Sequence, residues 1–295
     1  MVAVIELPAP AKRVAVVGAD GFVGRWMFAT VRAHHPDALG TGRRPGEGLA
    51  HLDLTDHVDL PWAGHSDGLI LAGQTNVGAC ERDPRGTRLV NVEGTLRVAE
   101  SMLAEGVRPV FFSSDYVFSG REGGYRPNSP REPTTEYGRQ KVAVEDGLRA
   151  LSDRALIVRL GKTFSVERGS GTLLDETAAQ LARGEMVRAA TDQVLTPTRV
   201  EDVVCAVLAL LGLGNGGTFH VCGPALTRYE LVCRLALAMG IPSRRVEPVR
   251  LSDLELTPPR PLNSAMTEDA LGPIMERRLI PLSDSIAETA ASWRD

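Results

Sequence analysis

The feature that most constrains the fold of this chain is a glycine-rich turn close to its beginning. Residues 13–17 (RVAVV) form a short β-branched run typical of a buried strand, and residues 18–24 (GADGFVG) follow at once, ahead of a helical pattern. Glycines at this spacing allow a tight turn and let backbone N–H groups at a helix N-terminus approach a pyrophosphate. A strand-to-helix turn without a ligand is the alternative, but the order strand, glycines, helix favours a dinucleotide-binding loop.

The first half of the chain continues this alternation. Apolar runs at residues 68–71, 110–112 and 156–158 have the length and composition of buried parallel strands. Between them, apolar residues at spacings of three and four predict one buried helix face, on a helix that Pro84 can precede and Gly106 can end. These residues are Leu89, Val92, Leu96, Ala99 and Leu103. We expect an α/β fold, with a doubly wound parallel (Rossmann) sheet whose ligands bind at the carboxyl ends of the strands.

After about residue 160 the pattern changes. Helical patterns at residues 173–181, 200–211 and 227–239 alternate with polar segments, and residues 242–261 are rich in proline and irregular. We expect a dinucleotide-binding domain at residues 1–160 and a smaller C-terminal substrate-binding lobe at residues 161–295. The helix near residues 200–211 is expected to return to the sheet.

Composition excludes several other classes of protein. The formal charge of -4, from 33 basic and 37 acidic residues, gives no electrostatic footprint for nucleic acid or an anionic membrane. No apolar stretch approaches the roughly 20 residues of a spanning helix, and Glu6 interrupts the segment where a signal peptide would be apolar. The cysteines form no C-x-x-C pair, which argues against a zinc site and structural disulfides. We expect a cytoplasmic protein without a metal site.

The residues after the second predicted strand, 39–42, bear on the choice of cofactor. A ribose 2′-hydroxyl is bound by a carboxylate at this point, whereas a 2′-phosphate is bound by arginine, and this chain has Arg43 and Arg44. An ordinary solvated loop is the alternative. We expect NADPH to bind at least about tenfold more tightly than NADH. We also expect Asp53, after the third strand, at the adenine edge.

Tyr137 and Lys141 stand four residues apart, which on a helix puts both side chains on one face. The chain has only three lysines, Lys12, Lys141 and Lys162, so chance would produce such a pair with a probability of about 4%. An ammonium one turn away stabilises tyrosinate and makes the phenol a better proton donor to a carbonyl under reduction. The pair therefore predicts a ketoreductase site.

Two polar residues extend this predicted site. Ser114 follows the strand at residues 110–112, where its hydroxyl can hydrogen-bond the reacting carbonyl, although a simple loop serine is the alternative. Asn91, on the preceding helix, is either a polar core residue or a group that orders water near Lys141.

Several motifs in this order resemble an extended short-chain dehydrogenase/reductase, and more narrowly the dTDP-4-dehydrorhamnose reductase family. They are the glycine turn, residues 91–95 (NVEGT), 113–118 (SSDYVF) and 137–141 (YGRQK), Pro197 and Thr198 ahead of Asp202, and residues 260–264 (RPLNS). The resemblance implies NADPH-dependent reduction of a nucleotide-linked 4-keto-deoxysugar. It implies Ser114, Tyr137 and Lys141 as the catalytic set, with Tyr137 as the proton donor.

The expected contacts fall into two sets. Cofactor contacts are expected from Gly18, Asp20, Gly21, Phe22, Val23, Gly24, Arg43, Arg44, Asp53, Leu54, Ala72, Gly73, Gln74, Asn91, Tyr137 and Lys141. Substrate contacts are expected from Ser114, Asp115, Tyr116, Tyr137, Lys162 and Arg260.

Lys162 is where the chain departs from the family pattern. Members of the family typically continue, after the sixth strand, from an arginine through two small residues to a tryptophan, whereas here residues 159–161 (RLG) lead to Lys162. A lysine offers a charge and hydrogen-bond donors in place of a flat apolar face. If Lys162 faces the substrate, we expect a more polar or differently oriented ketosugar; the alternative is a side chain turned to solvent.

Two other functions are compatible with the same motifs. An epimerase or dehydratase of nucleotide sugars shares the scaffold, but dehydratases carry Asp-Glu where this chain has Asp115 and Tyr116, and epimerases usually retain NAD. A non-catalytic regulatory subunit resembling that of methionine adenosyltransferase is the second alternative, against which the complete Ser-Tyr-Lys set argues. Homodimers are common in the superfamily, although no motif here requires one.

Overall fold

The computed structural model describes residues 13–44, 48–267, 271–275 and 278–294. Contacts divide the chain into two compact units. The first unit comprises Met1–Val117, Arg131–Arg159 and Val204–Phe219, and the second comprises Phe118–Pro130, Leu160–Val203 and His220–Asp295.

A seven-stranded sheet forms the centre of the first unit. Its strands, in the order in which they lie side by side, are β11 (Gly217–Val221), β6 (Leu156–Leu160), β5 (Arg108–Ser114), β4 (Asp67–Ile70), β1 (Val14–Val17), β2 (Gly40–Gly42) and β3 (Ala50–His51). The pairs from β5 through to β3 are parallel. The predicted α/β fold with a parallel sheet is confirmed. Because the strand order reverses between β1 and β4, the loops after these two strands meet at the switch point where such sheets bind ligands.

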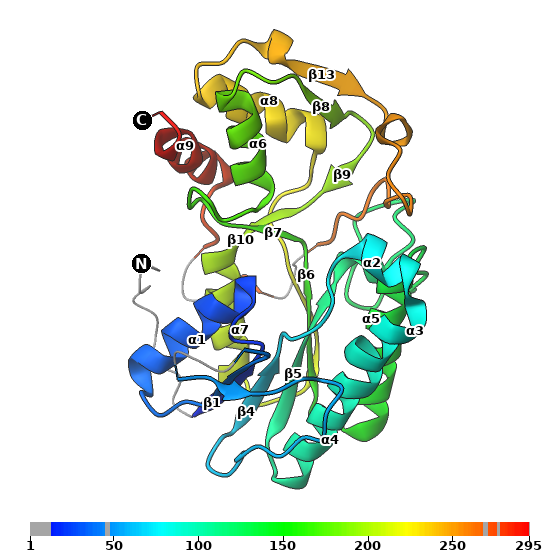
Figure 1. Ribbon diagram of the computed structural model, residues 1–295, viewed down its shortest axis with the longest axis vertical. Coiled ribbons are helices and arrows are strands. Elements are labelled where there is room, and N and C mark those ends of the chain that lie inside the picture. The colour runs from blue at the N-terminus through cyan, green and yellow to red at the C-terminus, as the bar shows by residue number, and fades with distance from the viewer. Residues whose placement is uncertain (1–12, 45–47, 268–270, 276–277, 295) are drawn as a thin grey trace. The chain divides into compact units, whose positions relative to one another are not determined.

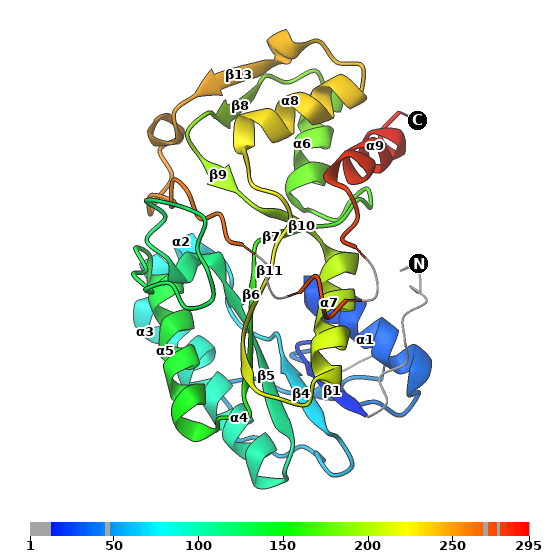
Figure 2. The same cartoon turned by 180° about the vertical axis from the view of Figure 1, so that it is seen from behind.

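Helices cover both faces of this sheet. In Figures 1 and 2, α1 (Phe22–His34) and α7 (Val200–Gly212) lie on one face, and α4 (Thr95–Ala104) and α5 (Glu136–Leu151) lie on the other, together with the short α2 (Val77–Arg82) and α3 (Pro84–Arg88). The core under α4 and α5 is apolar and almost fully buried; its members include Trp62, Val98, Met102, Phe111, Val144 and Leu148. This burial fixes α5, which carries Tyr137 and Lys141, against the sheet.

The helical path between Pro84 and Ala104 contains a π-helical segment, Leu89–Gly94. It shifts the buried face, so that Asn91, Val92, Thr95, Val98 and Met102 are buried. Leu89, predicted to belong to the buried stripe, is instead 48% exposed. That part of the prediction is wrong, because a π turn holds more residues than the α-helical period assumes.

In the described part of the second unit, short strand pairs lie with α-helices. Two pairs are parallel, β7 (Lys162–Phe164) with β10 (Pro197–Arg199) and β8 (Val187–Ala190) with β13 (Val246–Val249); β9 (Val194–Leu195) runs antiparallel to β12 (Leu226–Thr227). The helices are α6 (Leu173–Ala182), α8 (Arg228–Ala238) and α9 (Leu282–Ser292), grouped beside β8 and β13 in Figure 2.

One apolar core holds these three helices together, with Leu174, Leu231, Leu235 and Ile286 among its buried members. Helix α8 begins with a capping box, in which Thr227 and Glu230 bond each other's backbone N–H groups. The predicted helices at residues 173–181, 200–211 and 227–239 are confirmed. Among the described residues, no helix has the length and apolarity needed to cross a membrane.

Candidate functional site

The glycine turn packs so closely that a side chain would not fit at Gly18 or at Gly24. A Cβ at Gly24 would lie 1.9 Å from the carbonyl oxygen of Gly18, and a Cβ at Gly18, whose φ is +86°, would lie 2.6 Å from the backbone nitrogen of Ala72. Helix α1 begins at Phe22 without a side-chain cap and without an acidic residue in its first turn. Its first N–H groups are therefore available to an anion, and the helix dipole favours negative charge there. These residues fit the pyrophosphate of a dinucleotide.

The residues expected near the adenosine end lie after β2 and β3. Arg43 and Arg44 are exposed, Leu54 is buried and Asp53 is partly buried. The backbone and the hydroxyl of Thr55 donate hydrogen bonds of 2.9 and 2.7 Å to Asp53 Oδ1, and with the nearby charge of Arg43 they lower the pKa of Asp53. Asp53 is thus held as a carboxylate close to Arg43.

Asn91 ties the loop after β4 to α5. Its Oδ1 accepts a 2.7 Å hydrogen bond from the backbone of Gln74, and its Nδ2 donates to the Gln74 carbonyl at 2.9 Å and to Gln140 Oε1 at 2.8 Å. A Cβ at Gly73, whose φ is +154°, would lie 2.9 Å from Asn91 Oδ1. Of the two roles considered for Asn91, these contacts support a buried polar group that sets the path of residues 72–74.

Ser114 and Tyr137 come together at the carboxyl end of β5. Ser114 Oγ donates a 2.8 Å hydrogen bond to Asp115 Oδ1 and accepts one of 3.2 Å from the backbone of Tyr116. The rings of Tyr116 and Tyr137 pack edge to face, with centroids 5.8 Å apart. Four residues predicted from the sequence therefore share one site.

The Tyr137 hydroxyl is not easily ionised in this structure. Burial raises the pKa of Tyr137 above its ordinary value and the charge of Asp115 raises it further, whereas a hydrogen bond with Ser114 lowers it. The spacing of Tyr137 and Lys141 predicts that the ammonium stabilises the tyrosinate, which would lower this pKa. The net shift has the opposite sign, because burial outweighs any stabilisation of the tyrosinate.

Lys141 points toward β5. Its Nζ donates a 2.7 Å hydrogen bond to the carbonyl of Phe112, and lies 4.5 Å from the ring centroid of Phe111 and 5.6 Å from that of Tyr137. Burial lowers the pKa of Lys141 to about 8, although the charge of Glu145 raises it. The lysine is therefore a cation near neutral pH and loses its proton at mildly alkaline pH.

Glu145 is a residue of this site that the sequence analysis did not identify. It lies one helical turn after Lys141, is fully buried, and accepts hydrogen bonds from Ser113 Oγ at 2.6 Å and from Arg159 at 2.8 and 2.7 Å. Burial, the largest single effect, raises its pKa, but the hydrogen bonds from Arg159 and Ser113 and the charges of Arg159 and Arg149 together outweigh burial, so the net pKa of Glu145 is lowered. The signal was available as a carboxylate that continues the four-residue spacing of Tyr137 and Lys141.

Lys162 and Arg260, predicted to contact the substrate, belong to the second unit. Lys162 begins β7 and is exposed, and Arg260 Nη1 donates a 3.2 Å hydrogen bond to the carbonyl of Pro258. Their contact with a sugar stays a prediction.

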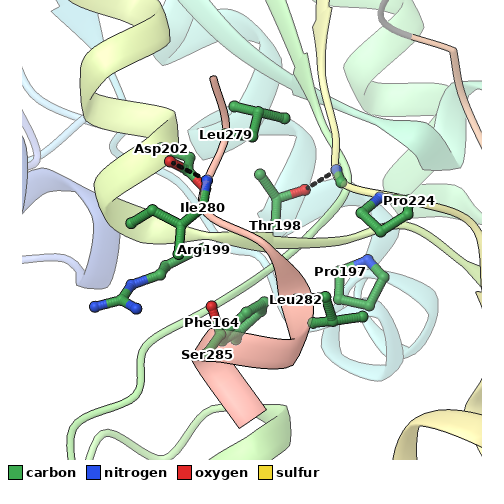
Figure 3. Close-up of a pocket in the computed structure, with 11 residues that line it drawn as sticks. Phe164, Pro197, Thr198, Arg199, Asp202, Pro224, Leu279, Ile280, Leu282 and Ser285 are labelled. Carbon is green, nitrogen blue, oxygen red and sulfur yellow. Dashed lines mark hydrogen bonds between the residues drawn. The ribbon is translucent and has the colours of Figure 1, made fainter. Parts of the chain in front are cut away.

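A small cavity in the second unit is lined by none of the residues predicted to be catalytic. Its volume of about 20 Å³ is large enough for one water molecule and too small for a substrate. Figure 3 shows hydrogen bonds beside it, from the backbone of Gly223 to Thr198 and from that of Ile280 to Asp202. Ser285 Oγ, at its wall, has no partner among the described residues. The cavity is a structural void.

The chain is similar to several known proteins over most of its length. A family model, the RmlD substrate binding domain, matches residues 12–293. A probable low-salt glycan biosynthesis reductase (Agl14) of Haloferax volcanii is 28% identical over 95% of this chain and 98% of its own. The dTDP-4-dehydrorhamnose reductase of Mycobacterium tuberculosis is 29% identical over 87% of this chain and 85% of its own.

The chain is also similar to a methionine adenosyltransferase subunit and to a solved reductase structure. Methionine adenosyltransferase 2 subunit beta of Bos taurus is 28% identical over 83% of this chain and 77% of its own. Among solved structures, a dTDP-4-dehydrorhamnose reductase from Bacillus anthracis in complex with NADP has a TM-score of 0.80 at 21% identity, over 93% of this chain and 97% of that one. Since the family model covers nearly the whole chain, this protein belongs to the family of the RmlD substrate binding domain.

Proposed function

We propose that this protein is an NADPH-dependent reductase of a nucleotide-linked 4-keto-deoxysugar, with Tyr137 as the proton donor. The observation that carries the proposal is the grouping of Ser114, Tyr137 and Lys141 at the carboxyl end of β5, in the unit that also carries the glycine turn. The curated relatives named as reductases support the same reaction class.

The bound cofactor would supply the hydride that the reaction needs. Its pyrophosphate fits the uncapped N-terminus of α1, beside which Gly18 and Gly24 leave no room for a side chain of their own. Arg43 and Arg44 would hold the 2′-phosphate, and Ala72, Gly73 and Gln74 would line the cleft after β4. The close approach of Gly18 to Ala72 keeps these two loops together.

The side chains would handle the proton. Tyr137 gives its phenolic proton to the oxygen of the reduced carbonyl, and its raised pKa keeps that proton in place until charge develops. Ser114 polarises the same oxygen by donating a hydrogen bond, for which it must turn from Asp115. Lys141 binds the nicotinamide ribose as a cation and stabilises the tyrosinate that forms.

The test is turnover on a panel of nucleotide sugars. Purified protein is mixed with NADPH and 4-keto-6-deoxysugars linked to dTDP, UDP or GDP, and loss of NADPH absorbance is followed with product analysis. Turnover on one of these substrates supports the proposal. No turnover on any of them, with NADPH bound, would contradict it.

A second candidate is a regulatory subunit that acts by binding a partner. The specific observation in its favour is the 28% identity to methionine adenosyltransferase 2 subunit beta. Capture of a methionine adenosyltransferase by the immobilised protein, together with an inert substrate panel, would support it. Complete retention of the Ser114, Tyr137 and Lys141 set favours the reductase.

A further inference from the structure

The end of β2 carries no side chain of its own, but a carboxylate from another segment fills its place. A Cβ built at Gly42, the last residue of β2, would lie 2.8 Å from Asp20 Cγ and 3.0 Å from Asp20 Oδ2. The carboxyl group of Asp20 therefore occupies the space that a side chain at residue 42 would enter.

Hydrogen bonds hold the glycine turn in this position. The backbone N–H groups of Gly18 and Ala19 both donate to the carbonyl of Thr41, at 3.1 and 2.7 Å. Thr41 also lies opposite Val17 in the parallel register of β1 and β2. Asp20, the next residue in the turn, is thus fixed beside Gly42 by the backbone, and its side chain has no hydrogen-bond or ion-pair partner within the described ranges 13–44, 48–267, 271–275 and 278–294.

This place has a defined chemical meaning in a dinucleotide fold. About 20 residues after the glycine turn, an Asp or Glu at the end of the second strand accepts a hydrogen bond from the ribose 2′-hydroxyl, and a carboxylate there repels a 2′-phosphate. Gly42 stands at that point of this chain, and Asp20 brings the carboxylate to it from the turn.

Neighbouring charges are balanced. Arg43 and Arg44 favour a 2′-phosphate, but Arg43 also lies near enough to Asp53 to lower the pKa of that carboxyl. Two carboxylates, Asp20 and Asp53, therefore oppose two guanidiniums at the ends of β2 and β3. The arginines alone overstate the preference for NADPH.

We infer that Asp20 is a specificity-determining residue that faces the 2′-position of the adenosine ribose and limits the preference of this protein for NADPH over NADH. The inference rests on the proposed dinucleotide site. The Asp20 carboxylate would face the 2′-position as the side chain of an acidic residue at position 42 would. The absence of a side chain at Gly42 leaves the space that this carboxylate occupies.

The first experiment measures the dissociation constants of NADPH and NADH by titration calorimetry for the wild type and Asp20→Asn. Loss of the carboxylate removes repulsion from the 2′-phosphate and weakens the bond to the 2′-hydroxyl, so the ratio of Kd for NADH to Kd for NADPH should rise about tenfold. Asp153→Asn is the matched control, because it removes one exposed carboxylate just before β6, which is separated from β2 by three strands of the sheet.

The second experiment moves the carboxylate. Asp20→Ala should weaken NADH binding about tenfold, and the double variant Asp20→Ala with Gly42→Asp should restore it, because removing Asp20 frees the space that the new side chain needs. Adenosine 2′-phosphate and adenosine serve as small probes that report the 2′-position without the pyrophosphate.

The outcomes separate the inference from the proposed function. If neither dinucleotide binds the wild type, the proposed function fails. If both bind and Asp20→Asn changes the two constants by the same factor, Asp20 acts at the pyrophosphate and the inference is overturned. An Asp20→Asn ratio equal to that of Asp153→Asn overturns it as well.

Discussion

Arg159 holds Glu145 with two hydrogen bonds, from Nε at 2.8 Å and from Nη2 at 2.7 Å, and both side chains are almost completely buried. The pair joins α5 to β6, and Ser113, which also bonds Glu145, joins it to β5. Ser114 follows Ser113 directly in the chain, and Lys141 lies one helical turn before Glu145 on α5. The ion pair is therefore connected to the proposed catalytic residues through Ser113 and through α5.

Replacing Glu145 should be costly. In Glu145→Gln the buried guanidinium of Arg159 loses its charged partner, and we expect the free energy of unfolding to fall by about 3 kcal/mol in denaturant titrations. The adjacent Asp146 makes only surface ion pairs and its side chain is 55% exposed, so Asp146→Asn should cost less than about 1 kcal/mol. If the free energy of unfolding falls equally in the two variants, the buried ion pair stabilises the fold no more than the surface ion pairs do.

Tyr137→Phe removes the proposed proton donor and leaves the ring. We expect kcat to fall at least about 100-fold, with the Kd for NADPH within about twofold of the wild type. Tyr229→Phe, in the second unit, should leave both quantities unchanged. Turnover near the wild-type rate in Tyr137→Phe would remove this hydroxyl from the mechanism.

The pH dependence should follow Lys141. Because the pKa of Lys141 is lowered from 10.5 to about 8, the ammonium is lost as the pH rises through 8, and kcat/KM should then fall about tenfold per pH unit. The charge of Glu145 raises that pKa, so Glu145→Gln should begin its decline at lower pH.

The effect of Lys141 on stability depends on pH in the opposite direction to its effect on activity. In the unfolded chain the lysine keeps its proton up to about pH 10.5, so the unfolded chain binds more protons than the folded one between pH 8 and 10.5. This group therefore makes the fold more stable as the pH rises through that window.

For the activity prediction, a kcat/KM that stays constant up to pH 10 would mean that the charge of Lys141 is not needed.

Lys162 tests the nature of the sugar. If its side chain meets the substrate, Lys162→Ala should raise KM for the true substrate several-fold and leave the Kd for NADPH unchanged. Lys162→Trp should improve activity on dTDP-4-dehydrorhamnose. If the wild type reduces dTDP-4-dehydrorhamnose efficiently and Lys162→Ala has the same activity, the prediction of a more polar or differently oriented sugar is wrong.

Local patterns were enough to predict much of the fold. The strand before Gly18 and the helix that carries Tyr137 and Lys141 depend on period and spacing, which neighbouring residues determine. The exposed Leu89 was mispredicted because a π turn breaks that period without a sequence marker.

Contacts between distant segments were beyond such reasoning. Glu145 meets Ser113 and Arg159 only after α5 packs on the sheet, and Asp20 meets Gly42 only when β1 and β2 pair. The ring of Tyr125 stacks on that of Phe118, with centroids 4.3 Å apart. The backbone of Tyr125 also forms a β-bridge with Met266, about 140 residues later, and no local sequence pattern predicts that pairing. Packing, rather than propensity, decides these relationships.

The π-helical segment at Leu89–Gly94 makes this region intolerant of changes in chain length. Deleting one residue there would return the path to regular α-helix, and every residue on one side would rotate by about 100° relative to the other. Thr87, whose hydroxyl accepts a 2.9 Å hydrogen bond from Gln140, and Asn91 could then no longer both face α5. Insertions and deletions in natural variants should therefore avoid these six residues, while the exposed turn at Glu105 and Gly106 accommodates them.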